Sequence, residues 1–231
     1  LEILDMYYPG PDENFISGTN TKTGEGFTAD YNDQKPFSAR VYKTLVDPFI
    51  GKYSMIKVCS GVLKPDTTVL NVNKDTEEKI GRLYVLRGKE AIEVPELRAG
   101  DLGAIAKLSV TTTGDSLATK EVPIQYEKTE LSVPYTYMAS RAKNKGDEDK
   151  IASALGKLME EDQTLRSVND KENRQLLLYG IGEQQLEVVV SKLMNRYKVE
   201  IELSRPKVAF RETIRGKVKV QGKHKKQSGG H

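Results

Sequence analysis

The glycine pair Gly180 and Gly182 has the spacing of a phosphate-binding turn. It follows an apolar run typical of a strand and opens a helical pattern, and Glu200 lies about twenty residues further on, as in a dinucleotide-binding fingerprint. Gln185 occupies the place of the third glycine, which close helix–strand packing requires, and the next strand alternates instead of being apolar throughout. We therefore interpret the pair as a structural turn and keep a nucleotide-binding enzyme as a distant alternative.

Other arrangements that could support catalysis or metal binding are weak. The sequence contains no Gly-x-x-x-x-Gly-Lys-Ser/Thr segment and so has no P-loop. The three acids at 160–162 are expected to be solvated, whereas acid–base catalysis needs a carboxyl group with a raised pKa. His224 and His231 have no third ligand nearby. The sequence therefore predicts no catalytic residue, no bound metal and no cofactor in this chain.

Composition limits the class of protein further. The chain has 231 residues, of which 37% are hydrophobic and 30% charged, enough for one large domain or two ordinary ones. No stretch approaches the ~18 consecutive apolar residues that span a bilayer, and no charged-then-apolar leader opens the chain. The single cysteine, Cys59, lies in an apolar run and is expected to be a buried small residue in a reducing compartment. We expect a monomeric cytoplasmic protein that does not bind membranes.

Charge is distributed unevenly along the chain. Residues 205–231 carry a net charge of +8, whereas the rest of the chain carries −5. Such a basic tail indicates either a polyanionic partner or a solvated arm, and charge alone does not separate the two. Lys223, Lys225 and Lys226 lie in a glycine-containing stretch able to sit against phosphates, but no aromatic residue lies between them to stack on bases.

The elements that would position these residues fall into two groups. Residues 36–127 hold short β-rich runs separated by turn residues such as Asp47-Pro48 and Gly100-Asp101, because proline presets φ and glycine supplies positive φ. Short strands with frequent turns predict a closed barrel or a sandwich. The predicted strands are 41–45, 55–62, 67–71, 79–86 and 102–108. Before them, residues 1–6 predict the end of a short helix and residues 12–35 a linker or surface loop.

Residues 128–204 have a different pattern. Apolar residues alternate at 131–137, recur with helical spacing from Ile151 to Met159, alternate again at 164–168 and 175–179, return to helical spacing from Leu186 to Tyr197, and alternate at 199–203. This order, β-α-β-β-α-β, predicts a ferredoxin-like domain. Residues 208–220 predict one or two further strands with nothing following to pair them.

Several stretches, taken in order and spacing, resemble bacterial elongation factor G and its close paralogues. They cover nearly the whole chain from residue 38 onward. They include Asp-Pro-Phe-Ile-Gly-Lys at 47–52, Thr-Thr-Gly-Asp at 112–115, Met-Glu-Glu-Asp at 159–162, Gly-Ile-Gly-Glu at 180–183 and Gly-Lys-His-Lys-Lys-Gln-Ser-Gly-Gly at 222–230.

The resemblance implies a fragment of a translational GTPase with β and α+β domains. It implies that residues 1–35 are the end of a GTPase domain and a linker, 36–127 a translation-factor β-barrel, 128–204 a ferredoxin-like third domain, and 205–231 the start of a fourth. The parent would use GTP, with Mg²⁺, bound in its GTPase domain to promote movement of tRNA and mRNA on the ribosome. The fragment itself would bind the ribosome without being an enzyme.

The resemblance also implies where contacts lie. Ribosomal RNA and small-subunit proteins are expected as partners, with Asp47, Pro48, Phe49, Gly51 and Lys52 as contact residues, together with Lys223, Lys225 and Lys226 of the tail. Gly182, Glu183 and Gln185 are expected on the surface that faces the GTPase domain of the intact chain.

One motif departs from the family pattern. Where the family form resembles Gly-Met-Gly-Glu-Leu-His-Leu, this chain has Gln185 in place of the histidine. A paralogue acting in ribosome recycling, rescue or protection is therefore the alternative to the main translocase. The sequence at 210–230 argues against a ribosome-protection protein, because it resembles the translocase form of the fourth domain.

Overall fold

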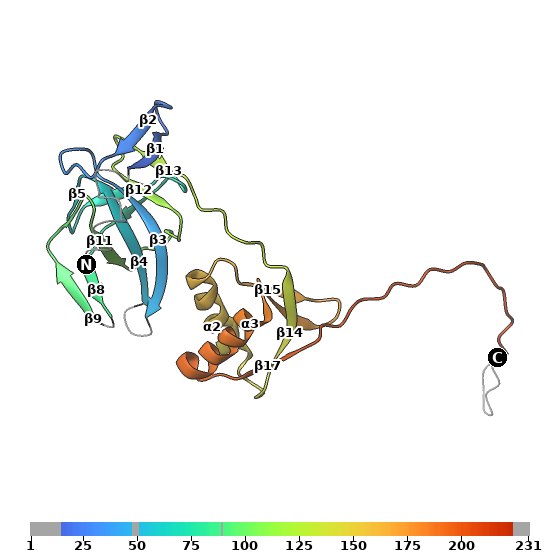
Figure 1. Ribbon diagram of the computed structural model, residues 1–231. Helices are drawn as coiled ribbons and strands as arrows, with labels where there is room; N and C mark the ends of the chain where they lie inside the picture. Colours follow the sequence, from blue (N-terminus) through green and yellow to red (C-terminus); the bar gives the residue numbers. More distant parts are fainter. Residues whose placement is uncertain (1–14, 48–50, 89, 224–231) are drawn as a thin grey trace, which may run out of the picture.

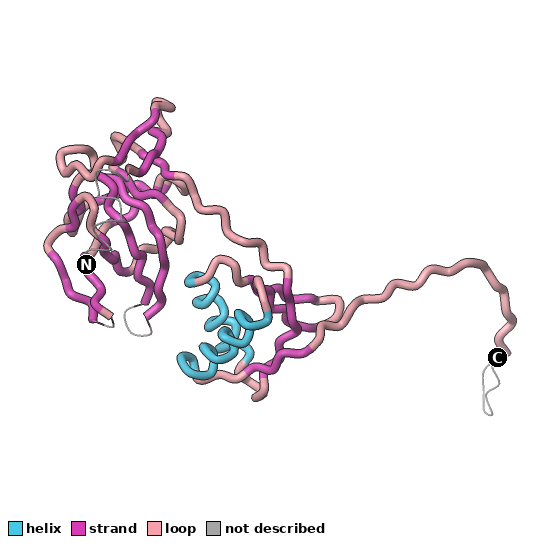
Figure 2. Tube along the Cα trace, in the orientation of Figure 1, coloured by secondary structure: helices cyan, strands magenta, loops and turns pink. Residues whose placement is uncertain are grey.

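The computed structural model describes residues 15–47, 51–88 and 90–223, and shows two compact parts (Figure 1). The first part is built from strands, and the second combines strands with helices (Figure 2). An extended segment at 127–135 joins them, and an extended tail follows the last strand. The helix predicted at residues 1–6 lies outside the described residues.

The first part is centred on an eight-stranded antiparallel sheet that curls around its core (Figure 1). The order of the strands is β7-β6-β12-β3-β4-β11-β8-β9. Inward side chains such as Val41, Ile56 and Leu117 are fully buried. The fold predicted as a β-barrel is confirmed. The strands are β3 (Ser38–Asp47), β4 (Gly51–Ser60), β6 (Thr68–Asn71), β7 (Thr76–Lys79), β8 (Leu83–Arg87), β9 (Glu90–Val94), β11 (Leu102–Ala106) and β12 (Ser116–Ala118), with a two-stranded pair of β5 (Val62–Leu63) and β10 (Leu97–Arg98) beside them.

A second, three-stranded sheet corrects the expectation for residues 12–35. Strands β1 (Ile16–Asn20) and β2 (Gly26–Ala29) pair with each other, and β1 also pairs with β13 (Ile124–Tyr126). Part of the predicted linker is therefore strand. Its polar composition hid the pattern because only one face is covered, against a small core that includes Cys59 and Tyr126. Cys59 is fully buried, as predicted.

The second part has the predicted ferredoxin-like plan. Strands β14 (Thr136–Ala142), β15 (Arg166–Asp170), β16 (Gln175–Gly180) and β17 (Ile201–Ser204) form a sheet in the order β15-β16-β14-β17. Helices α2 (Glu148–Glu161) and α3 (Glu183–Lys192) lie on one face of this sheet (Figure 1). Their shared core includes Leu155, Leu178, Leu186 and Val199. Helix α3 continues into a π-helical turn, Leu193–Tyr197, which ends where Lys198 adopts the left-handed conformation.

Several strand predictions differ from the structure. The strand predicted at 79–86 is interrupted at residues 80–82, between β7 and β8, and two others differ because of the strands available to pair with them. The strand predicted at 131–137 begins only at Thr136, because its neighbour β16 ends at the paired residue Gly180. Residues 208–220 keep an alternating pattern but form no strand, and Val208, Phe210 and Ile214 are exposed. A strand pattern without a partner strand gives no ladder.

Candidate functional site

The flanks of the β3–β4 hairpin carry the first group of predicted contact residues. Asp47 ends β3, and Gly51 and Lys52 begin β4, with Gly51 at a φ of 97°. The Lys52 ammonium group donates to the Thr111 carbonyl oxygen at 3.0 Å. Pro48 and Phe49 lie outside the described residues. The hairpin is therefore tied to residues 109–115, which form most of the connection between β11 and β12 and are called the 109–115 loop below.

Glu78 fixes the first half of the 109–115 loop. This carboxylate on β7 accepts hydrogen bonds from the backbone N–H groups of Val110 at 3.0 Å and Thr111 at 3.1 Å, and also from the N–H of Ser109. Burial opposes ionisation, but the bonds from Thr111, Val110 and Ser109 outweigh it and lower the pKa of Glu78. The loop is thereby held by an ionised, almost fully buried side chain.

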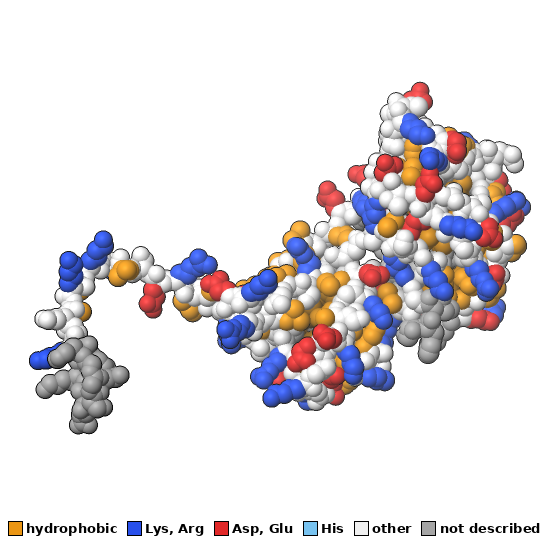
Figure 3. Space-filling view, turned by 180° about the vertical axis from the view of Figure 1, so that it is seen from behind, with side chains coloured by type: hydrophobic (Ala, Val, Ile, Leu, Met, Phe, Trp, Pro, Cys, Tyr) orange, Lys and Arg blue, Asp and Glu red, His pale blue; other side chains and the backbone are white. Residues whose placement is uncertain are grey.

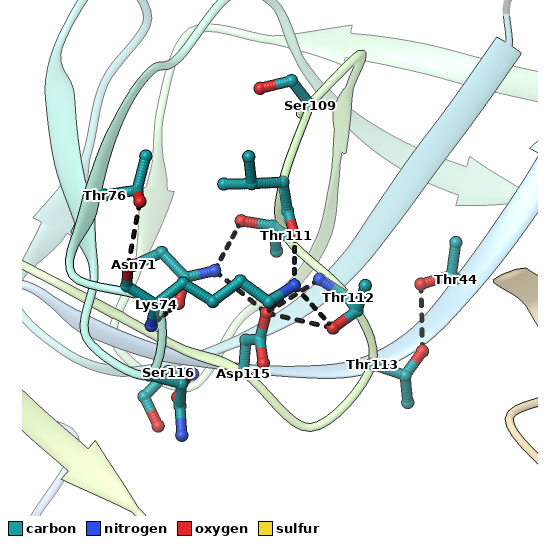
Figure 4. A network of polar contacts seen from close by, with 12 residues as sticks. Thr44, Asn71, Lys74, Thr76, Ser109, Thr111, Thr112, Thr113, Asp115 and Ser116 are labelled. Carbon is teal, nitrogen blue, oxygen red and sulfur yellow. Dashed lines mark hydrogen bonds and ion pairs between the residues drawn. The ribbon is translucent and has the colours of Figure 1, made fainter.

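Asp115 fixes the second half of the loop (Figure 4). Its buried carboxylate accepts from Asn71 Nδ2 at 2.9 Å and from the Thr112 N–H at 2.9 Å. It also pairs with the ammonium groups of Lys128 at 2.8 Å and Lys74 at 3.1 Å. Burial alone would raise its pKa, but the bonds from Lys128, Asn71 and Thr112 hold the pKa well below its usual range. Neither buried acid was recognised from the sequence.

The barrel contacts the second part through a side-chain pair. Glu161 at the end of α2 accepts from the backbone N–H of Val46 at 3.0 Å, and Arg196 donates to the Val46 carbonyl oxygen at 2.7 Å. Gln163 adds a hydrogen bond of 2.9 Å to the carbonyl oxygen of Thr113. The expectation that the acids at 160–162 are all solvated is wrong for Glu161, whose side chain is only 10% exposed, and for Asp162, which is partly buried.

Gln185 joins the predicted Gly180–Gly182 turn to the end of α2. Its carbonyl oxygen accepts from the Ile181 N–H at 2.7 Å, and its amide nitrogen donates to Asp162 at 2.7 Å and to Thr164 at 2.8 Å. A Cβ at position 180 would lie 2.5 Å from that carbonyl oxygen, so glycine there allows the Gln185 side chain its present position. Burial acts against the charge on Asp162, but the bonds from Thr164 and Gln185 lower its pKa.

The neighbouring residues Gly182 and Glu183 lie at the start of α3. Gly182 is the N-cap of the helix and is partly buried, whereas Glu183 is exposed in the first turn. The antiparallel pairing of β16 with both β14 and β15 differs from the parallel sheet that a dinucleotide fingerprint requires. The structure therefore gives the turn a packing role, as the sequence interpretation favoured.

The basic tail leaves the second part beside β16. Lys207 is held there by two backbone hydrogen bonds of 2.9 Å to the side-chain amide of Gln175. Beyond it, cationic side chains project at intervals along the extended chain (Figure 3). Lys223 is exposed, while Lys225 and Lys226 lie outside the described residues.

Comparison with known proteins places this architecture in a family. Residues 36–120 match the family model for elongation factor G domain 2, and residues 131–205 match the model for elongation factor G domain III. The chain carries these two domains of the elongation factor G family. We refer to them below as domain II and domain III.

A solved structure agrees with this arrangement. The crystal structure of a protein from Thermus thermophilus superposes with a TM-score of 0.68 at 30% sequence identity. The alignment covers 90% of the present chain and 29% of that protein, so the chain spans under a third of the relative's length.

Within the described residues, none of the helices combines the length and hydropathy needed to cross a bilayer. Among the same residues, no cluster of three His, Cys, Asp or Glu side chains has the geometry of a metal site. The polar chemistry near the predicted contacts instead consists of buried acids holding backbone groups of the 109–115 loop and of Val46.

Proposed function

We propose that this chain is a ribosome-binding, non-catalytic part of a translational GTPase that promotes translocation of tRNA and mRNA. The observation that carries the proposal is the match of both described domains, in order, to domain 2 and domain III of elongation factor G. Each domain has its own core, and buried acids hold the 109–115 loop beside the hairpin in place, so the pair suits docking better than chemistry.

The proposed ribosome-facing surface is the β3–β4 hairpin with the basic tail. Lys52 presents a cation next to a loop that Glu78 and Asp115 hold in one conformation. A fixed loop loses little conformational freedom on binding, which favours docking on ribosomal RNA and small-subunit proteins. In the tail, Lys223, Lys225 and Lys226 would add phosphate contacts of the sequence-independent kind.

Co-sedimentation with 70S ribosomes tests this function. The full-length parent is used, with and without a non-hydrolysable GTP analogue, and we expect more protein in the ribosome pellet with the analogue. Lys52→Ala should weaken binding, whereas Lys79→Ala, which removes an exposed cation paired with Asp66 elsewhere on the barrel, should not. Equal binding by wild type and Lys52→Ala would remove the hairpin from the proposed surface, and absence of the parent from the pellet under both conditions would refute the function.

The fragment alone is proposed to neither bind nor hydrolyse GTP, because its sequence has no P-loop. GTP and Mg²⁺ would be held by the GTPase domain of the parent, against which Gly182, Glu183 and Gln185 are proposed to lie. Titration calorimetry of the 231-residue chain with GTP should give no saturable heat. Micromolar binding would favour the nucleotide-binding alternative instead.

A second candidate is a paralogue with a duty in ribosome recycling or rescue. The observation that favours it is Gln185. It occupies the position of the histidine in the family form of the motif, and here it links the turn before α3 to Asp162 and Thr164. A translocation assay with the full-length parent separates the candidates, because a recycling factor would split post-termination ribosomes without moving tRNA.

A further inference from the structure

The end of β3 presents an unusual edge to domain III. Earlier in the strand, residues 38–40 pair with β12, and Val41 exchanges backbone hydrogen bonds with Gly114 and Asp115. Val46 lies opposite Lys52 of β4, and its N–H and C=O groups both bond to domain III side chains. At this point two side chains occupy the position that another strand would take.

Glu161 and Arg196 reproduce the hydrogen-bonding pattern of a neighbouring strand. One Glu161 oxygen accepts from the Val46 N–H at 3.0 Å, and one Arg196 nitrogen donates to the Val46 carbonyl oxygen at 2.7 Å. The two side chains are also joined to each other by two bonds, of 3.0 and 3.1 Å. A planar guanidinium can make these contacts simultaneously, and an ammonium group cannot copy its fork.

The pair is sheltered, and its two members come from well-fixed positions. The side chain of Glu161 is 10% exposed and that of Arg196 is 33% exposed, so the pair is less screened by water than an ordinary surface ion pair. Glu161 is the last residue of α2, and Arg196 lies in the π-helical turn after α3. Both side chains therefore bind the backbone of a single barrel residue, Val46.

We propose that Glu161 and Arg196 are positioning residues that latch domain III to the barrel at Val46, and that the latch couples domain III to the ribosome-contacting hairpin. Val46 directly precedes Asp47 and faces Lys52, so a shift of the hairpin on docking moves the two groups that the latch holds. Coupling of this kind is reciprocal. If ribosome binding at the hairpin changes the stability of the latch, loss of the latch must change the ribosome affinity of the hairpin by the same factor. The part of the proposal that concerns coupling rests on the proposed ribosome binding, whereas the part that concerns the latch does not.

Hydrogen exchange at the Val46 amide tests the latch in the 231-residue chain without ribosomes. Glu161→Ala removes the acceptor of that amide, so exchange at Val46 should become roughly tenfold faster, as expected for losing a bond to a charged group. Arg196→Ala should act in the same direction and should widen the distribution of domain separations seen by small-angle scattering. Arg196→Lys should give a smaller change, because it keeps the charge and loses the fork.

Lys143→Ala provides the matched control. It breaks an ion pair of 2.7 Å with Glu200 that lies within domain III, and it should leave both Val46 exchange and scattering unchanged. Circular dichroism identifies any variant that fails to fold. If Arg196→Ala does not fold, Arg196→Lys serves as the test variant in its place. Unchanged Val46 exchange in folded Glu161→Ala and Arg196 variants would overturn the latch.

Ribosome affinity of the full-length parent tests the coupling. The Arg196→Ala parent should bind 70S ribosomes with an altered affinity, and ribosomes should change Val46 exchange in the wild-type parent. Normal affinity together with fast Val46 exchange in the variant would retain the latch and refute the coupling. A wild-type parent that does not bind ribosomes would refute the proposed function and the coupling together, while the ribosome-free measurements would still decide the latch.

Discussion

The buried carboxylate of Asp115 offers the sharpest test of how the 109–115 loop is held. Asp115→Asn keeps the size of the side chain and one acceptor oxygen but removes the charge. In the wild type this carboxylate receives hydrogen bonds from Asn71 and Thr112 and pairs with Lys74 and Lys128. The amide that replaces it cannot accept from all of these donors, and one of its ends becomes a donor itself.

The size of the effect follows from burial. The Asp115 side chain is 0% exposed and the Asn71 amide that donates to it is fully buried, so this donor cannot turn to water without local opening, although the half-exposed Lys128 can. Removing one partner of a buried ion pair costs about 3–5 kcal/mol, which is the expectation for Asp115→Ala. The asparagine variant keeps part of the network and should lose about 2 kcal/mol. Glu93→Gln, which breaks an exposed pair with Arg82, should change stability by under about 0.5 kcal/mol.

The assay must report the barrel separately from domain III, because the two units have separate cores. The sequence contains no tryptophan, so fluorescence offers no convenient probe. Hydrogen exchange followed by mass spectrometry in a urea series gives the unfolding free energy for peptides from β3 and β4, and peptides from β14 and β16 serve as the internal reference. We expect the loss in the barrel peptides alone.

The pH dependence has a defined sign. The folded-state pKa of Asp115 lies below its unfolded value, so its contribution is present above about pH 3.9 and is lost as pH falls through the folded pKa. The stability difference between wild type and Asp115→Asn should therefore be greatest at about pH 7 and should shrink below about pH 4. The pKa of Glu78 is also lowered in the folded chain, but Glu78 is present in both proteins, so its contribution to the pH dependence cancels in the stability difference. Equal barrel stability near neutral pH, or a difference that grows in acid, would refute the reasoning.

Two further predictions concern the tail and the cysteine. If the tail lysines contact RNA phosphates, a plot of log RNA affinity against log salt concentration should have a slope of roughly −0.7 to −0.9 per contact. Deletion of residues 205–231 should make this slope shallower. A flat salt response in the intact chain would indicate a solvated arm. Burial raises the pKa of the Cys59 thiol, so labelling by a thiol reagent should be slow in the native chain and fast in urea, and rapid native labelling would contradict its core position.

The two-domain plan could be predicted from the sequence because the spacing of apolar residues reflects which side chains of each helix and strand are buried. The spacing from Ile151 to Leu158 placed one face of α2 in the core, and turn residues marked the hairpins of the barrel. Residues 16–29 were not recognised, because a half-covered strand with glycine and threonine has the composition of a loop. Strand ends were also predicted wrongly where the end of the partner strand determines them, as at Thr136, which pairs with the last residue of β16.

The polar framework of the site was beyond the reach of the sequence. Glu78 and Asp115 are local acids among many, and only the tertiary fold brings them to the backbone of the 109–115 loop. The same applies to Glu161, which meets Arg196 and Val46 across 35 and 115 residues of chain. The acids at 160–162 appeared solvated because helical position alone does not reveal a neighbouring domain. The hairpin and tail contacts stay predictions, since their test lies in binding.

Gln185 leads to a last prediction about pH. Its amide accepts from Ile181 and donates to Asp162 and Thr164 at the same time, and it does not titrate in the physiological range. In Gln185→His, the imidazole would lie beside the Asp162 carboxylate, whose charge is already favoured by Thr164 and by the more distant Lys192. The carboxylate should raise the folded-state pKa of that imidazole above its unfolded value of about 6.5.

A raised folded-state pKa fixes the direction of the change. The stabilisation from the charged imidazole is present in full below about pH 6.5 and is lost as pH rises through the folded pKa, so domain III of Gln185→His should lose stability between about pH 6.5 and 8. The protonated ring cannot accept from Ile181, which makes the variant less stable than wild type even in acid, by about 1 kcal/mol. Exchange of β14 and β16 peptides at several pH values measures this. Parallel stability curves for the two proteins would mean that the side chain at 185 does not contact Asp162, and the amide bridge between the α3 turn and the end of α2 would have to be abandoned.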